Sequence, residues 1–124
     1  MGLALMIVDD SATMRKIIMK TVRMSGVEIE RTEEAGNGIE ALEKLNQGTV
    51  DMMLVDVNMP GMGGPELVKK VRELPSCSNT KIIMVSTESS QELIDNMLAS
   101  GANGYITKPF TPENFQKKLM QCTN

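Results

Sequence analysis

Short runs of apolar residues recur along the chain and alternate with longer stretches in which apolar residues return every three or four positions. The short runs are typical of β-strands, and the unbroken apolar run at 52–55 is typical of a strand covered on both faces. The segment 28–34 is more polar, so we expect it at an edge of the sheet. The predicted strands are 3–8, about 28–34, 52–55, 82–85 and 104–107.

An amphipathic helical stretch follows each predicted strand. We expect the first of these helices to bury Ile17 and Ile18, and the second to bury Ile39 and Leu45. The predicted helices are about 12–25, 38–47, 65–74, 90–100 and 112–121.

Strands that alternate with helices of this length predict a parallel sheet with right-handed crossovers. Five such units in 124 residues favour the flavodoxin-like doubly wound fold. This α/β fold has a five-stranded parallel sheet in the order 2-1-3-4-5, flanked by five helices. Because the sequence shows no repeat or linker, we expect one domain over residues 1–124.

Composition narrows the classes of function. The hydrophobic fraction of 41% and the charged fraction of 23% are typical of a soluble globular domain. A net charge of −3 gives no general attraction for nucleic acid, and the apolar start is too short for a membrane span. Cys77 and Cys122 form no CxxC pair. We therefore expect a cytoplasmic monomer with reduced thiols that binds neither nucleic acid nor membrane.

Polar side chains follow four of the predicted strands, at the end where parallel strands of this fold bind ligands. Asp9 and Asp10 follow the first strand, Asp56 the third, Ser86 the fourth and Lys108 the fifth. Three neighbouring carboxylates repel one another and have raised pKa values unless a cation lies between them. The sequence has no histidine, and an oxygen-rich cluster suits Mg²⁺ better than a softer metal.

Carboxylates around Mg²⁺ are a typical setting for phosphoryl transfer, in which a carboxylate can be the nucleophile. Lys108 would neutralise a phosphoryl oxygen, and Ser86 could donate a hydrogen bond to another. Each residue alone has a simpler interpretation: an aspartate after a strand is more often a helix N-cap, and a lysine is ordinarily a solvated charge. The functional interpretation depends on finding carboxylates, a hydroxyl and a lysine together at the ends of four predicted strands.

The segments MIVDDSATMRK, MLVDVNMPGMGG, IIMVSTES and GYITKPF resemble, in order, the defining segments of response regulator receiver domains. The resemblance covers essentially the whole chain. It implies that Asp56 accepts a phosphoryl group and binds Mg²⁺ together with Asp10. It also implies that Asp9 binds the ion through water and that Asn58 binds it through its backbone carbonyl.

The same resemblance implies a switch and two partners. Ser86 and Tyr105 match the coupled hydroxyl and aromatic switch pair, and Lys108 matches the lysine that contacts phosphate, with a cis bond to Pro109. The implied partners are a histidine kinase and a downstream effector. We expect the effector on the face made by the fourth helix, fifth strand and fifth helix, where phosphorylation should move Tyr105 from an exposed to a buried position.

Within the family, the chain most resembles the single-domain chemotaxis regulators, whose effector is the flagellar motor switch. Asn58, Glu88, Tyr105 and Lys118 match that type. The departures from it are Val57 in place of tryptophan, Gly63 in place of aspartate, and Ser90-Gln91 in place of a basic pair.

Other functions remain as alternatives. A stand-alone receiver can be a phosphorelay intermediate or a phosphate sink, and a pseudo-receiver only binds partners. A haloacid-dehalogenase-type phosphatase also uses an aspartate nucleophile with Mg²⁺, but its nucleophile usually lies on the first strand and is followed by a second acid two residues later. Here the residue two positions after Asp56 is Asn58. A flavodoxin-like electron carrier is excluded because Asp9 and Asp10 would repel its phosphate. We therefore expect a signalling protein that assists its own phosphorylation and dephosphorylation, and not an enzyme.

Overall fold

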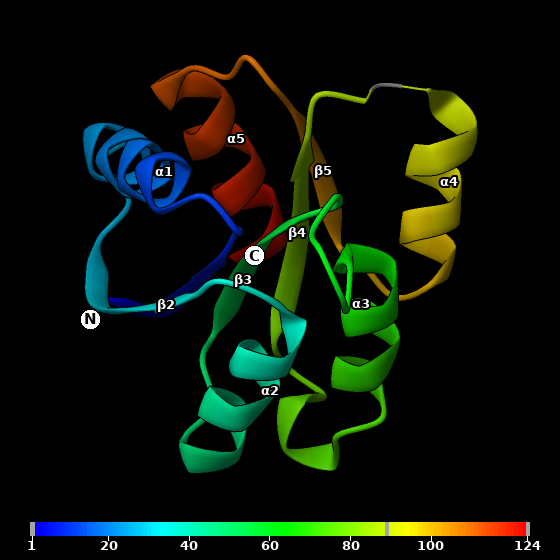
Figure 1. Cartoon of the computed structure of the whole chain (residues 1–124). Helices are drawn as coiled ribbons and strands as arrows, with labels where there is room; N and C mark the ends of the chain where they lie inside the picture. Colours follow the sequence, from blue (N-terminus) through cyan, green and yellow to red (C-terminus); the bar gives the residue numbers. More distant parts are fainter. Residues whose placement is uncertain (1, 89, 124) are drawn as a thin grey trace.

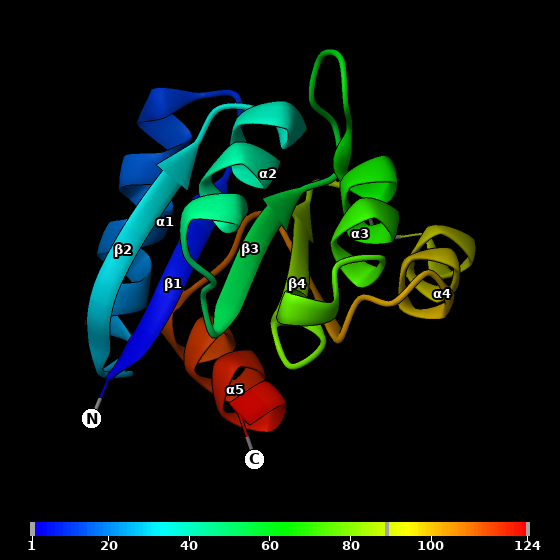
Figure 2. The same cartoon turned by 90° about the horizontal axis from the view of Figure 1, so that it is seen from below.

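The predicted strands form one parallel sheet in the order β2-β1-β3-β4-β5. The computed structural model describes residues 2–88 and 90–123, and Figures 1 and 2 show the sheet between its helices. The more polar strand β2 lies at an edge, as expected. The strands are β1 (Leu3–Val8), β2 (Ile29–Ala35), β3 (Met52–Asp56), β4 (Lys81–Ser86) and β5 (Gly104–Thr107).

The predicted helices are also present, with small differences at their ends. The third helix ends at Arg72 and is followed by a short 3₁₀ turn, because Pro75 disfavours helical backbone at the residue before it. Ser11, Asn37 and Ser90 cap the first, second and fourth helices with their side chains. The helices are α1 (Ala12–Met24), α2 (Gly38–Gln47), α3 (Gly64–Arg72), α4 (Gln91–Ala99) and α5 (Pro112–Thr123).

The alternation of side chains along the central strands divides the core into two layers. In β1, Leu5 and Ile7 face α1 and α5, whereas Met6 and Val8 face the layer of α2, α3 and α4. Figure 1 shows the two groups of helices on opposite faces of the sheet. Both faces are therefore covered, and the ends of the strands are the part of the sheet open to a ligand.

Two predictions of buried residues are wrong. Ile39 is 57% exposed, because α2 buries Ala41 and Leu45, and a residue two positions before Ala41 lies about 200° around the helix from it. Ile17 is 45% exposed, because Ile18 and Val22 define the buried side of α1. The apolar pattern identified both helices but not the exact direction of their inner faces.

Cys77 and Cys122 are both free thiols, the first buried and the second partly buried. Among residues 2–88 and 90–123, no helix is long and apolar enough to cross a membrane.

Candidate functional site

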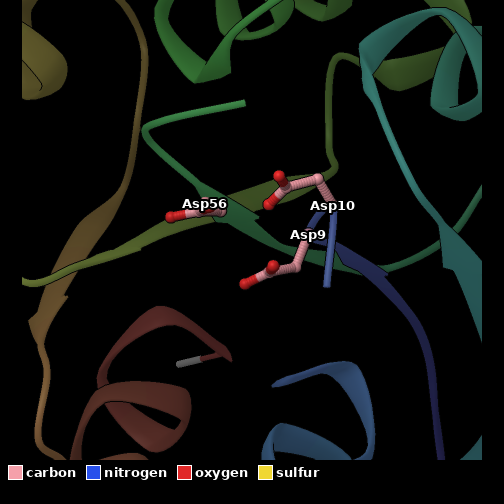
Figure 3. Close-up of side chains that lie close together, drawn as sticks. All are labelled: Asp9, Asp10 and Asp56. Carbon is pink, nitrogen blue, oxygen red and sulfur yellow. The ribbon is translucent and has the colours of Figure 1, made fainter. Parts of the chain in front are cut away.

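The register of β1 and β3 brings the acidic residues together. Val8 lies opposite Val55, so Asp9 and Asp56 follow at the same level where the two strands end. Asp10 is the next residue along the chain and is exposed, whereas Asp9 and Asp56 are buried. One carboxylate oxygen from each of the three residues lies within 4.8 Å of the others. Figure 3 shows the three side chains close together.

The two strands on the other side of β3 add a hydroxyl and an ammonium group. Asp56 lies opposite Val85, so Ser86 follows one position beyond it at the same end of the sheet. Ser86 lies opposite Thr107, and the backbone N–H of Lys108 donates to the Ser86 carbonyl at 2.7 Å. The structure thus brings the predicted strand-end residues to one rim.

Lys108 lies between two of the carboxylates. Its Nζ is 3.6 Å from Asp9 Oδ2 and 3.6 Å from Asp56 Oδ1, and its side chain is 15% exposed. Burial and the charge of Asp9 raise the pKa of the Asp56 carboxyl, although the Lys108 charge and the Asn58 backbone N–H oppose this. One ammonium group therefore does not balance the negative charge of the site.

The ligand atoms that this site offers fit Mg²⁺. Asp9 Oδ1 accepts a hydrogen bond from the Ser11 backbone N–H at 2.9 Å, but the buried Asp9 Oδ2 has no hydrogen-bond partner among the described residues. A buried carboxylate oxygen that accepts no hydrogen bond is costly, and the Lys108 ammonium group at 3.6 Å, which Asp9 shares with Asp56, compensates only part of this negative charge. Because every side-chain donor in the cluster is a carboxylate oxygen, the site suits a hard divalent ion.

Glu88 connects three of the predicted site residues. Its backbone N–H donates to Ser86 Oγ at 3.1 Å, and its backbone carbonyl accepts from the Tyr105 hydroxyl at 2.9 Å. Its carboxylate accepts from Asn58 Nδ2 at 3.1 Å. The sequence indicated Glu88 only through the resemblance, because nothing in the sequence signals that its backbone joins Ser86 to Tyr105.

Tyr105 is buried in this structure, with 7% of its surface exposed. The ring packs in the core layer that includes Met84 and Met97, and its hydroxyl bond to Glu88 reaches the β4–α4 loop. Of the two positions expected for this ring, the structure shows the buried one.

An apolar hollow of about 430 Å³ lies beside the acidic site. Met14 and Ile17 of α1 line one side, and Pro109 and Phe110 of the β5–α5 loop line another. The peptide bond between Lys108 and Pro109 is cis, as the resemblance implied. The exposed Ile17 therefore belongs to an apolar surface next to the carboxylates.

A doubly wound α/β fold with three carboxylates, a lysine and a hydroxyl at the ends of its strands is an arrangement suited to a divalent cation and a phosphoryl group. The family model for the response regulator receiver domain matches residues 5–120. The chain belongs to the response regulator receiver domain family, whose members are signalling domains of two-component systems and not classical enzymes.

Similar proteins are chemotaxis proteins. The chain is 43% identical over 116 residues to the chemotaxis protein CheY1 of Helicobacter pylori, which covers 93% of this chain and 92% of that protein. It is 38% identical over 118 residues to CheY-3 of Vibrio cholerae, and the matched residues cover 95% of this chain and 89% of that protein. The solved structure of Vibrio cholerae CheY4 superposes with a TM-score of 0.87 at 37% identity, covering 98% of this chain and 99% of that one.

Proposed function

We propose that this chain is a phosphorylation-dependent switch that accepts a phosphoryl group on Asp56 from a phosphohistidine of a histidine kinase. The single observation that best supports the proposal is the cluster of Asp9, Asp10 and Asp56, with Lys108 at 3.6 Å from the Asp56 carboxylate. We also propose that the chain acts in chemotaxis, because its relatives of 38% and 43% identity are chemotaxis proteins.

In the proposed reaction, an Asp56 carboxylate oxygen attacks phosphorus while the phosphorus–nitrogen bond to the donor imidazole breaks. The product is an acyl phosphate on Asp56, and the bond electrons leave with the imidazole, which takes up a proton. Lys108 stabilises charge on a phosphoryl oxygen. Ser86 Oγ accepts from Glu88, so its own proton can be donated to a second phosphoryl oxygen. Bound Mg²⁺ would supply charge neutralisation and orientation, held by Asp9, Asp10, Asp56 and the Asn58 carbonyl.

The hollow beside the site supports a protein donor. A phosphohistidine needs to reach Asp56 from outside, and the hollow between α1 and the β5–α5 loop offers apolar surface next to Lys108. We propose that the kinase domain carrying the histidine contacts this surface, which would explain the exposure of Ile17.

The face of α4, β5 and α5 is the proposed binding site of the effector. Leu98 is 43% exposed on α4, and a hollow of about 270 Å³ next to Tyr105 is lined partly by Lys117 and Lys118 of α5. Ser90, at a position where related regulators have a basic residue, caps α4 by accepting from the Leu93 N–H at 3.2 Å. We propose the flagellar motor switch as the effector, as the resemblance to single-domain chemotaxis regulators implies.

The proposal is tested by incubating the protein with acetyl phosphate and Mg²⁺ and measuring its intact mass. We expect one added phosphoryl group that appears with Mg²⁺ and does not form when a chelator is present from the start. Catalytic release of phosphate from many small phosphate esters would instead support the phosphatase alternative. An unchanged mass would support a pseudo-receiver and contradict the proposal.

Replacing Asp10 with Ala is expected to weaken Mg²⁺ binding about tenfold or more, because it removes one charged metal ligand. Titration calorimetry with Mg²⁺ measures this change. Glu43→Ala is the matched control, because it removes the same charge from an exposed position in α2. Equal affinities of the two variants would contradict the assignment of Asp10 as a ligand.

The phosphorylated protein is expected to lose its phosphoryl group quickly, because Asn58 and Glu88 are polar residues that leave a path for an attacking water. Their side chains are exposed and hydrogen-bonded to each other at 3.1 Å. Asn58→Met should slow the loss of the phosphoryl group several-fold by adding bulk. Glu88→Gln keeps an acceptor for Asn58 and should change the rate of loss less. The decay of phosphorylated mass after removal of acetyl phosphate measures both rates. Faster or unchanged decay in Asn58→Met would contradict this explanation.

A further inference from the structure

Arg15 links the start of α1 to the acidic site and to the end of β2. Its Nη1 donates to the backbone carbonyl of Asp9 at 2.6 Å, and its Nε donates to Glu34 Oε1 at 2.9 Å. The Arg15 side chain is 18% exposed, so these bonds are partly shielded from water. Arg15 therefore makes its contact with the acidic site through the backbone and not through a carboxylate.

The other end of this link is fixed in the fold. Glu34 lies in β2 opposite Ile7 of β1, and its backbone carbonyl accepts a hydrogen bond from the Lys44 ammonium group of α2. The Asp9 backbone N–H donates to Ala35 at the end of the same strand at 3.1 Å. The guanidinium group is thus held by the sheet on one side while it holds the Asp9 carbonyl on the other.

The Asp9 carbonyl belongs to the peptide unit that joins Asp9 to Asp10. The orientation of this unit sets the directions in which the two side chains leave the backbone. Asp9 and Asp56 are buried near each other, and Asp10 is exposed on a bend, so rotation of the backbone at this peptide unit would let the mutually repelling carboxylates move apart. A hydrogen bond from a planar, fixed guanidinium group opposes that rotation.

We propose that Arg15, anchored by Glu34, is a positioning residue that holds the Asp9–Asp10 peptide unit in the orientation required for cation binding. The inference rests on the proposed function, because it concerns the metal site of that function. The free energy of cation binding would then depend on the ion pair between Arg15 and Glu34 near the end of β2, although neither side chain is a proposed ligand of the cation. Arg15 acts on the metal through the backbone of Asp9.

The sign of a charge effect separates this role from simple electrostatics. Arg15 carries a positive charge near three carboxylates, so removing the charge alone should make the site more negative and tighten the binding of a cation. Loss of positioning should weaken binding, by about tenfold if it resembles the removal of other groups that orient metal ligands. The two explanations of Arg15 therefore predict changes of opposite sign.

The experiment compares Mg²⁺ affinities by titration calorimetry in two matched pairs of variants. Arg15→Met is paired with Lys16→Met, which removes the same charge from an exposed position one residue further along α1. Arg15→Lys keeps the charge but loses the fixed guanidinium geometry that reaches both Glu34 and the Asp9 carbonyl. It is paired with Lys16→Arg, which also conserves the charge, at the exposed neighbouring position. Thermal unfolding without Mg²⁺ shows whether each variant is folded.

We expect Arg15→Met to bind Mg²⁺ about tenfold more weakly than wild type, and Lys16→Met to bind it equally or more tightly. Arg15→Lys should bind more weakly than Lys16→Arg, whereas the charge alone predicts no difference, and this pair decides the question if Arg15→Met does not fold. Affinities of Arg15→Met and Arg15→Lys that equal or exceed those of their controls would overturn the inference. If wild type itself bound no Mg²⁺, the proposed function would fail instead.

Discussion

Replacing Asp56 with Asn is expected to abolish the uptake of a phosphoryl group from acetyl phosphate. Asp56 ends the central strand β3, and its carboxylate lies 3.6 Å from the Lys108 ammonium group. An amide is a very poor nucleophile toward phosphorus, and no other described carboxylate ends a strand next to both Lys108 and Ser86. Intact-mass measurement with acetyl phosphate and Mg²⁺ tests the result. A phosphorylated Asp56→Asn protein would refute the assignment.

The same substitution should stabilise the protein in buffer without divalent cations. Burial and Asp9 raise the pKa of Asp56 despite the opposing effect of Lys108, so the charged carboxylate is disfavoured in the folded state at neutral pH. Replacing it with a neutral amide removes this unfavourable contribution, which we expect to be on the order of 1 kcal/mol. The unfolding temperature should rise by roughly 4 °C for a domain of this size.

Asp95→Asn is the matched control for both effects. It makes the same chemical change on α4, at an exposed residue that accepts a hydrogen bond from Gln91 at 2.8 Å. This variant should be phosphorylated as wild type is, and its unfolding temperature should change little. Added Mg²⁺ should stabilise wild type and narrow the difference in unfolding temperature between wild type and Asp56→Asn, because the cation compensates the carboxylate charge. A lower unfolding temperature for Asp56→Asn without Mg²⁺ would contradict the electrostatic explanation.

The sequence predicted the fold and the convergence of the strand-end residues for the same reason. Parallel strands all begin at one end of the sheet and all finish at the other, so residues that follow strands meet even when they are far apart in the chain. Asp9, Asp56 and Lys108 could therefore be placed together before any distance was known. The order of the strands made β2 an edge strand, which agreed with its polarity.

Contacts between side chains and backbone groups could not be predicted in this way. The bond from Arg15 to the Asp9 carbonyl depends on how far a long side chain reaches over the first turn of α1, and apolar periodicity contains no signal for that. The bond that the Glu88 N–H donates to Ser86 Oγ and the bond that the Tyr105 hydroxyl donates to the Glu88 carbonyl likewise depend on where the chain runs after β4. Ile17 and Ile39 were predicted to be buried because the apolar pattern does not fix which way the inner face of each helix points.

Replacing Tyr105 with Ala is expected to separate phosphorylation of Asp56 from the response of α4. The Tyr105 ring fills space in the core layer that includes Met97 of α4, and its hydroxyl holds the Glu88 carbonyl at 2.9 Å. Glu88 in turn donates to Ser86 Oγ, the group that we propose donates its own proton to a phosphoryl oxygen. A change at Ser86 can therefore reach α4 through one loop and one ring.

The ring and the hydroxyl can be tested separately. Tyr105→Phe keeps the packing and removes only the bond to Glu88, whereas Tyr105→Ala removes both and should cost about 3–5 kcal/mol of stability, the range for truncating a buried aromatic side chain. Both variants should be phosphorylated on Asp56, because the ring is not part of the acidic cluster. Because the chain has one tyrosine and no tryptophan, the intrinsic fluorescence of the wild type reports on Tyr105 alone.

Hydrogen exchange of α4 (Gln91–Ala99), measured with and without acetyl phosphate and Mg²⁺, is the decisive measurement. In wild type, phosphorylation should change the exchange of α4 together with the tyrosine fluorescence, since both report on the β4–α4 loop. In Tyr105→Ala the change in exchange should disappear, and in Tyr105→Phe it should be reduced, because the loop has lost its bond to β5. The coupling lost should lie in the usual range of about 1–3 kcal/mol, so an effector of the α4–β5–α5 face would lose roughly 5- to 150-fold of its preference for the phosphorylated form. If phosphorylated Tyr105→Ala showed the same change in α4 as wild type, the signal would have to reach this face without Tyr105.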